Sequence, residues 1–410
     1  MFNYNNTILP NGINLITIKK ETGIASVHMG VKIGSMYEQK SQKGISHFVE
    51  HMMFKGTQSR NNEKLNSDLE KLGGEYNAYT DHNCTVYSAT ALCSEIEEIV
   101  KILSDMLQNS SFPIKEIIKE KEVILSEIRT SRDDLEEYSF KRINEIAYIN
   151  SPLKHETTGD EKTIKKFTQE ELINFYETFY VPNNCYISIV SPYEHEFIKD
   201  LVWEYFNNWS FKEIIRPEVI VENNIAGIEV TYKKNIEQST IIYLYTFHNI
   251  TKQGEVALKV LNHKFGESSN SILFRELRED KGLAYDVYTH LDLTNKVKTL
   301  YIYTAVGEEN IYKAIDTIDQ CISKIKSEEI IFDENTINLM KKVLNTAVAF
   351  TLEDSTDIGN YVLHQLIEDE YILQFVQDME KLESIKNEDI YDIARTVFNN
   401  PTIHILRNEN

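Results

Sequence analysis

The chain has 410 residues, 41% of them hydrophobic, which is enough for two or more domains that each bury a core. Its formal net charge of −21, from 43 Lys and Arg against 64 Asp and Glu, argues against nucleic acid as a partner, because the phosphates would be repelled, and would favour cationic peptides. The cysteines are widely spaced and form no CxxC pair, so we expect reduced thiols in an intracellular protein and a metal held by nitrogen and oxygen ligands. The four are Cys84, Cys93, Cys185 and Cys321.

The first residues do not resemble a targeting segment. Residues 1–6 have no basic region followed by an apolar run, and they lack the arginine-rich pattern of a transit peptide. No apolar run approaches the ~20 residues that span a bilayer. We therefore expect a cytoplasmic protein without a membrane span, or a protein of the mitochondrial matrix if the source is eukaryotic.

Two short strands are predicted near the start of the chain. A turn signal at Asn11-Gly12 precedes an apolar run over 13–18, and residues 26–33 alternate between apolar and polar. His28 is most simply a residue of the polar face of the second strand.

The stretch from Gly44 to Gly56 has the spacing of a metal-binding helix. The two glycines can begin and end a helix, in which His47 and His51 lie one turn apart on the same face. Two neutral imidazoles at that spacing can bind one zinc ion, while Glu50 stands beside it as a base. The order His-x-x-Glu-His is the inverse of the commoner metalloprotease motif. An ordinary packed helix with two histidines is the alternative.

Helices and strands then follow one another. The period of apolar residues predicts a helix over 62–72 that ends at Gly73-Gly74, a strand over 75–91, and an amphipathic helix over 95–108. This mixture predicts an α+β fold.

A glutamate-rich helix is predicted over 114–132, opened by Pro113. Each glutamate on it fits a solvated helix face, but two histidines and a water leave a tetrahedral zinc one ligand short. Glu120 and Glu127 are seven residues apart and share a face of this helix. One glutamate is therefore expected to complete the metal site.

A domain boundary is predicted in the middle of the chain. Residues 209–227 contain Pro217 and irregular charge, between helix and strand patterns on either side. The flanking elements are helices over 138–148 and 170–180, a strand over 185–190, and strands over 228–232 and 239–246. We predict a catalytic domain over 1–210, a linker over 211–226 and a second domain over 227–410.

The second half of the chain repeats the first. Residues 69–80 align with residues 278–289, at an offset of 209 residues, which indicates a duplicated α+β unit. At this offset the second copy has none of the candidate ligands. The positions of His47, Glu50, His51 and Glu127 become Val256, Lys259, Val260 and Thr336.

Four features together carry a family resemblance. They are Gly44-x-x-His47-Phe48-x-Glu50-His51-x-x-Phe54-Lys55-Gly56-Thr57, Asn77-Ala78-Tyr79-Thr80, the pair Glu120 and Glu127, and Arg278-Glu279-x-x-Gly282-Leu283-Ala284-Tyr285. With them, nearly the whole chain resembles the pitrilysin/insulinase family of inverted-zincin metallopeptidases, in particular its two-domain, mitochondrial-processing-peptidase-like bacterial branch. The resemblance implies two similar domains, each with a mixed, mostly antiparallel sheet flanked by helices.

The resemblance also implies roles for individual residues. Zinc, one ion per chain, is expected on His47, His51 and Glu127, with Glu120 supporting a ligand and Glu50 activating the zinc-bound water. The substrate-orienting arginine and tyrosine of the family correspond to Arg278 and Tyr285. The strand that binds substrate backbone corresponds to Asn77, Ala78 and Tyr79. From the residues alone, Tyr285 fits equally well as a strand residue that packs on the core.

The expected function is zinc-dependent hydrolysis of peptides or unstructured polypeptide segments inside an enclosed chamber. We expect a homodimer, because the zinc residues and the Arg278 and Tyr285 pair lie on one chain. Two alternatives stay open: a catalytically silent structural or binding subunit, and a catalytic subunit that needs a different partner chain.

Overall fold

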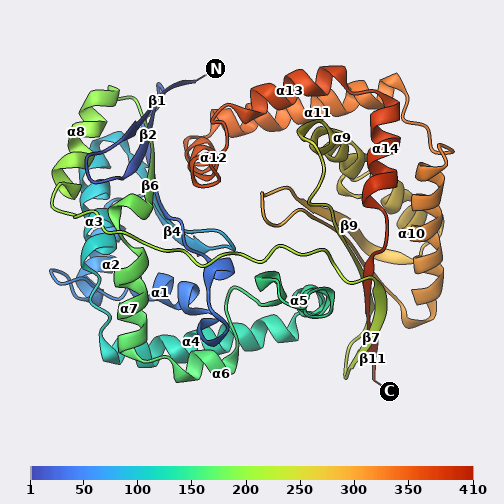
Figure 1. Cartoon of the computed structure of the whole chain (residues 1–410), viewed down its shortest axis with the longest axis horizontal. Helices are drawn as coiled ribbons and strands as arrows, with labels where there is room; N and C mark the ends of the chain where they lie inside the picture. Colours follow the sequence, from blue (N-terminus) through green and yellow to red (C-terminus); the bar gives the residue numbers. More distant parts are fainter. Residues whose placement is uncertain (1, 410) are drawn as a thin grey trace. The chain divides into compact units, whose positions relative to one another are not determined.

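The computed structural model describes residues 2–409, so Met1 and Asn410, the ends of the two predicted domains, lie outside the described residues. The chain forms two compact units, which Figure 1 shows in the colours of the sequence. The first unit contains residues 1–130, 155–219 and 349–372, and the second contains 131–154, 220–348 and 373–410.

The first unit is built on a six-stranded sheet in the order β1-β2-β6-β3-β5-β4. Strands β2 and β6 run parallel, and all other neighbours run antiparallel. The strands are β1 (Asn3–Ile8), β2 (Asn14–Lys19), β3 (Ile24–Val31), β4 (Glu75–Thr80), β5 (Thr85–Leu92) and β6 (Cys185–Ser191). The helices are α1 (Ile45–Met53), α2 (Asn62–Lys71), α3 (Ile96–Asn109), α4 (Ile114–Asp133, its last turn in the second unit), α6 (Glu161–Lys166), α7 (Gln169–Phe179), α8 (His195–Phe206) and α12 (Ser355–Ile367).

The second unit repeats this plan around a five-stranded sheet in the order β7-β11-β8-β10-β9. Its one parallel pair is β7 with β11. The strands are β7 (Gly227–Lys233), β8 (Ser239–Thr246), β9 (Ala284–Asp292), β10 (Thr299–Val306) and β11 (Thr402–Asn408). The helices are α5 (Leu135–Ala147), α9 (Lys252–Asn262), α10 (Ile311–Lys326), α11 (Glu334–Glu353, its last residues in the first unit), α13 (Gln374–Ser384) and α14 (Asn387–Val397).

The two sheets confirm the predicted fold class. Strands β2, β6, β3, β5 and β4 have the same order and directions as β7, β11, β8, β10 and β9, and only β1 has no counterpart. Each sheet is mixed, mostly antiparallel and flanked by helices, as the internal repeat predicts.

The units differ from the predicted continuous domains by two exchanged helices. Helix α12, from the second half of the chain, packs on β6 and β3 of the first unit, while α5, from the first half, packs on β8 and β11 of the second. Amphipathic periodicity shows that a helix has a buried face but not which sheet covers it, so the sequence could not reveal the exchange. The chain passes between the units five times, and one of these crossings, after Val219, lies inside a segment without helix or strand over 210–226.

The predicted long strand over 75–91 is a hairpin. It divides into β4 and β5 because the Asp81 side chain accepts hydrogen bonds from the backbone N–H groups of Asn83 and Cys84, both at 2.6 Å, and so closes a turn. The hairpin places β4 at the edge of the first sheet.

Both faces of β3 are buried, so β3 is a core strand. Val27 and Met29 lie on the face covered by α3, and Gly30 on the other face closely approaches Leu363 and Ile367 of α12. The face that carries His28, predicted as the polar face of the strand, is covered by α12, which leaves His28 2% exposed. A sequence window around β3 cannot contain the helix that buries it.

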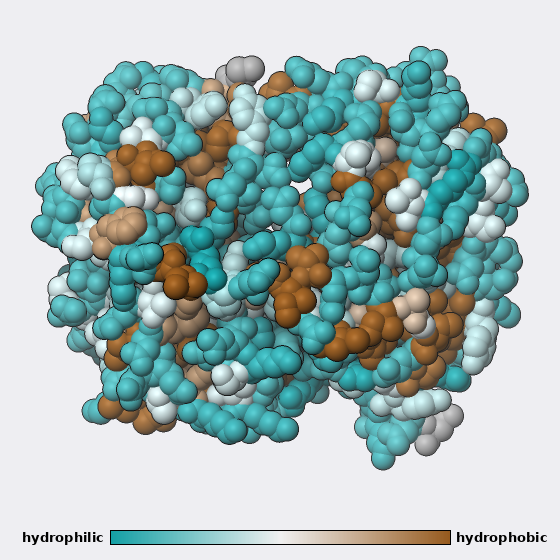
Figure 2. All heavy atoms as spheres, in the orientation of Figure 1, coloured by the Kyte–Doolittle hydropathy of each residue, from teal (hydrophilic) through white to brown (hydrophobic). Residues whose placement is uncertain are grey.

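No helix within residues 2–409 is both long and apolar enough to cross a membrane. Hydrophilic residues cover most of the face drawn in Figure 2, and hydrophobic residues gather in smaller separate patches.

The buried His28 predicts a pH dependence of stability. Burial, with a smaller effect of His364, lowers the pKa of His28 from 6.5 to about 4. The unfolded chain therefore takes up a proton at a higher pH than the folded chain, and this stabilising contribution is complete above pH 6.5 and is lost as the pH falls towards 4. Between pH 7 and pH 5, we expect the free energy of unfolding of His28→Gln to fall by about 2 kcal/mol less than that of wild type.

Urea unfolding at a series of pH values, followed by circular dichroism, measures both slopes. Equal slopes for the two proteins would show that His28 does not resist protonation in the folded state.

Candidate metal centre

Helix α1 carries the two histidines and begins at a glycine that the structure requires. Gly44 has a φ of 90°, and a Cβ there would lie 2.6 Å from the carbonyl oxygen of Thr158. A left-handed backbone and a close approach both favour glycine at this position. The apolar face of α1, which includes Phe48, Val49 and Met52, is fully buried. The two histidines therefore lie on the opposite side of the helix.

A buried glutamate outside the helix caps α1. The two carboxylate oxygens of Glu38 accept hydrogen bonds from the backbone N–H groups of Gly44 at 2.9 Å and Ser46 at 2.8 Å. These are N–H groups that a helix start leaves unpaired, and a carboxylate there also suits the helix dipole. Burial raises the pKa of Glu38 to about 7, although these hydrogen bonds act in the opposite direction. The position of α1 thus depends on a residue that no helix-start pattern would identify.

Three donor atoms from α1 and α4 converge on one point. The Nε2 atoms of His47 and His51 lie 4.0 Å and 3.6 Å from Oε2 of Glu127, and donor atoms of all three residues lie within 4.8 Å of one another. The imidazole rings are 4.5 Å apart and inclined at 63°. Two nitrogens and one carboxylate oxygen are a ligand set that zinc accepts, with a fourth position open.

The supporting glutamate holds one imidazole in a suitable state. Oε2 of Glu120 lies 3.0 Å from Nδ1 of His51, and its other oxygen, Oε1, pairs with Lys55 at 2.8 Å. With Nδ1–H donating to Glu120, Nε2 of His51 keeps its lone pair towards the ligand position. Burial lowers the pKa of His51, but the hydrogen bond with Glu120 and the charge of Glu127 outweigh it and raise the pKa. A bound cation would compete with that proton.

The other imidazole is neutral. Burial, with a smaller effect of His51, lowers the pKa of His47 to about 3, and neutral imidazole is the form that binds metals. Its buried Nδ1 has no hydrogen-bond partner among the described residues, so only one of the two histidines has a carboxylate behind it. The residues present therefore fit a zinc ion, with unequal support for the two nitrogens.

Glu50 lies beside the three donors without belonging to them. It is 9% exposed, and its Oε2 accepts a hydrogen bond from the Thr80 hydroxyl on β4 at 2.7 Å. Burial raises the pKa of Glu50, against smaller opposing effects from Thr80 and His51. A carboxylate with a raised pKa takes up a proton more readily, as a general base requires.

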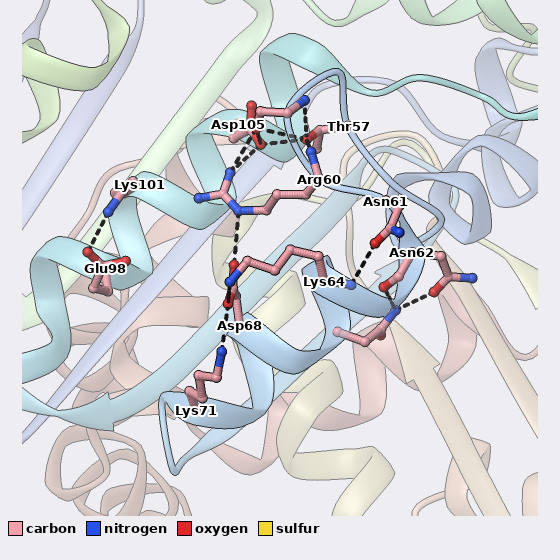
Figure 3. Close-up of polar contacts among 12 residues, drawn as sticks. Thr57, Arg60, Asn61, Asn62, Lys64, Asp68, Lys71, Glu98, Lys101 and Asp105 are labelled. Carbon is pink, nitrogen blue, oxygen red and sulfur yellow. Dashed lines mark hydrogen bonds and ion pairs between the residues drawn. The ribbon is translucent and has the colours of Figure 1, made fainter.

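An ionic network fixes the segment that follows α1, as Figure 3 shows. The Thr57 hydroxyl donates to Oδ2 of Asp105 on α3 at 2.6 Å, and Arg60 bridges Asp105 and Asp68 of α2. A hydrogen bond from Lys64 is the main cause that lowers the pKa of Asp68 to about 2. The network ties the end of α1 to α2 and α3, so the histidines sit on an anchored element.

The predicted substrate strand is the edge of its sheet. Asn77 and Ala78 lie on β4, which pairs with β5 on one side and with no other described strand on the other. Helix α1 contacts β4. The Tyr79 hydroxyl donates to Asn360 at 2.7 Å, so that side chain is held by α12. Any contribution of Tyr79 to substrate binding would therefore come from its backbone.

Arg278 and Tyr285 form a pair within the second unit. The Arg278 guanidinium lies 4.7 Å from the centre of the Tyr285 ring and donates to the Tyr285 carbonyl oxygen at 3.0 Å. Tyr285 is 73% exposed, so it is not a core residue, and the alternative left open by the sequence does not apply. Their contribution to catalysis stays a prediction.

Sequence reasoning missed three residues that support the site: Glu38, Lys55 and Thr80. Thr80 and Lys55 lie inside the motifs that carry the family resemblance, but the sequence does not show that they contact Glu50 and Glu120. Glu38 gives no pattern at all, because its role depends on a turn of the chain that brings it to the start of α1.

Comparison with known proteins places this geometry in a family. Residues 15–161 match the family model described as Insulinase (Peptidase family M16), and residues 166–344 match the Peptidase M16 inactive domain. A Rickettsia felis protein named an uncharacterized zinc protease is 31% identical over 98% of this chain and 96% of its own length. The chain belongs to the insulinase (M16) peptidase family. The family resemblance seen in the sequence is thereby confirmed.

Proteins from two other organisms are also similar to this chain. The beta subunit of the mitochondrial-processing peptidase from Caenorhabditis elegans is 24% identical over 96% of this chain and 86% of its own length. The crystal structure of a protease from Helicobacter pylori superimposes with a TM-score of 0.91 at 20% identity, covering 99% of both chains. That likeness shows that the two proteins share one fold.

The contact between Glu120 and His51 predicts a defined loss of metal affinity. In Glu120→Gln, the neutral amide can still accept from Nδ1–H but no longer supplies charge, so we expect zinc to bind roughly 10- to 100-fold more weakly. Competition with a chromophoric chelator measures the dissociation constant. Glu122→Gln is the matched control, because Glu122 lies on α4 with its side chain exposed. An unchanged affinity in Glu120→Gln would remove Glu120 from the site.

Proposed function

We propose that the chain is a zinc-dependent endopeptidase that hydrolyses peptides or unstructured polypeptide segments. The observation that supports it most is the convergence of His47 Nε2, His51 Nε2 and Glu127 Oε2 beside a buried, hydrogen-bonded Glu50. His47, His51 and Glu127 would hold one zinc ion. When bound, zinc polarises a peptide carbonyl and lowers the pKa of a water molecule.

Three residues of the chain would have separate roles in the reaction. Glu50 takes a proton from the attacking water and returns it to the leaving amine, a role that fits its raised pKa. Thr80 fixes the Glu50 carboxylate by donating to Oε2. Glu120 orients His51 and fixes its tautomer.

Substrate binding is proposed to use the edge of the first sheet. An extended peptide that adds to β4 along Asn77, Ala78 and Tyr79 would be recognised through its backbone, with little dependence on side-chain identity. Arg278 and Tyr285 would orient the substrate, and the exposed Tyr285 hydroxyl or the Arg278 guanidinium would stabilise the developing oxyanion.

The proposed assembly is a homodimer that encloses the reaction in a chamber. The ligand residues, Glu50 and the Arg278 and Tyr285 pair all belong to one chain, which supports self-sufficiency. The four cysteines are free, which supports the expected reducing location in the cytoplasm.

One relative supports an alternative function, a catalytic subunit that needs a different partner chain. That relative is named as the beta subunit of a processing peptidase. Activity of the purified chain alone would exclude that reading as well as a silent structural subunit. Metal binding without activity until a partner is added would favour it over the homodimer.

Replacing the proposed base separates catalysis from metal binding. Glu50→Gln keeps the size of the side chain and the hydrogen bond from Thr80 but cannot accept a proton, so we expect kcat to fall at least about 10³-fold with metal content unchanged. Hydrolysis of an internally quenched fluorescent peptide, with metal assayed by atomic emission, tests this. Activity that persists in Glu50→Gln would contradict its role.

The Tyr285 hydroxyl is tested by a matched pair of variants. Tyr285→Phe keeps the ring that stacks on Arg278 but loses the donor, and we expect kcat to fall about 10²-fold with little change in KM. Tyr312→Phe is the control, since Tyr312 is also an exposed tyrosine of the second unit, at 71%. Equal kinetics in the two variants would leave Tyr285 without a catalytic role.

A further inference from the structure

A second group of metal-ligand residues lies at the end of the β4–β5 hairpin. Asp81 and Cys84 belong to the turn between the two strands, and His364 belongs to α12, all within the first unit. Donor atoms of the three residues lie within 4.8 Å of one another. Nothing in the proposed peptidase mechanism uses them.

We propose that Asp81, Cys84 and His364 form a second binding site for a divalent metal ion of the zinc type. Thiolate, imidazole and carboxylate are all zinc ligands, and a water molecule would complete a tetrahedron. The site would raise the capacity of the chain from the one ion of the catalytic site to two. Binding does not depend on the peptidase activity.

The carboxylate and the thiol are already held together. Oδ1 of Asp81 accepts from the backbone N–H of Cys84 at 2.6 Å, and its Oδ2 lies 3.5 Å from the Cys84 sulfur. Ligand atoms around a tetrahedral zinc lie roughly 3.5 Å apart, so this pair needs little movement. A ring nitrogen of His364 lies within 4.8 Å of both atoms and supplies the third ligand.

The imidazole is prepared by a neighbouring tyrosine. The Tyr79 hydroxyl gives its hydrogen to Oδ1 of Asn360 at 2.7 Å, and Nε2 of His364 lies 2.7 Å from the same hydroxyl oxygen. With Nε2–H donating to Tyr79, the lone pair of His364 is on Nδ1, and this is the nitrogen that would bind the ion.

One donor is the sulfur of Cys84. The side chain is fully buried, and its sulfur lies 3.5 Å from Oδ2 of Asp81. On binding, the S–H proton would leave to solvent and the thiolate would bond to the ion. The second copy shows that the fold itself does not need this thiol: Lys298 precedes β10 where Cys84 precedes β5.

The position gives the ion a structural effect. Asp81 directly follows Thr80, the residue that donates to Glu50. An ion shared with His364 would tie this end of β4 to α12, and so would steady the strand beside the catalytic glutamate. It would act by positioning and would not touch the substrate.

Cobalt binding isolates the second site. In the double variant His47→Ala/His51→Ala, prepared without metal, we expect about one equivalent of Co²⁺ to bind and to give the near-ultraviolet absorption of a thiolate–cobalt bond. Adding Cys84→Ser should remove that absorption, and adding Cys93→Ser should leave it, since Cys93 is a free cysteine outside the cluster. His364→Gln, in which the thiol is kept, should weaken cobalt binding at least about tenfold. Circular dichroism checks that each variant is folded.

Absence of the thiolate band in the double variant, or its survival after Cys84→Ser, would overturn the proposal. If Cys84→Ser does not fold, unchanged cobalt affinity in His364→Gln would overturn it equally. Because the catalytic histidines are absent from this background, failure here is separate from failure of the peptidase assignment.

Discussion

The site depends on the packing of α1 against α4. His47 and His51 share a face of one helix by spacing alone, but the third donor, Glu127, comes from a helix 20 residues long that must be placed so that its oxygen lies 3.6 to 4.0 Å from both imidazoles. Burial of the apolar face of α1, the cap from Glu38 and the pairing of Glu120 with His51 and Lys55 all act on that placement. A small displacement between the helices would separate the donors.

Much of the site could be predicted because it follows from local rules. Four-residue spacing in a helix puts two histidines on one face, and seven-residue spacing does the same for Glu120 and Glu127. The family resemblance then assigned the third ligand. Contacts between distant segments could not be predicted: the Thr80 hydrogen bond to Glu50, the Glu38 cap, and α12 over β3, which buries His28. Each of these contacts joins segments whose proximity depends on the folded chain and not on a local sequence pattern.

The duplicated fold separates what the scaffold needs from what chemistry needs. Both units keep the same strand order, yet the helix positions that hold His47 and His51 in the first copy are Val256 and Val260 in the second. Val256 and Val260 are buried in the core of the second unit, so the same helix positions serve packing when no ligand is required. The second copy instead carries the pair of Arg278 and the exposed Tyr285.

The most direct test of a metal-dependent peptidase is the activity of the purified chain through a cycle of metal removal and return. The chain is assayed on a quenched fluorescent peptide, dialysed against a chelator, assayed again, and supplied with zinc. If the chain is a zinc-dependent peptidase, hydrolysis disappears with the metal and returns when zinc is restored. Hydrolysis that continues in the metal-free chain, or a zinc-loaded chain that cleaves nothing, would contradict it.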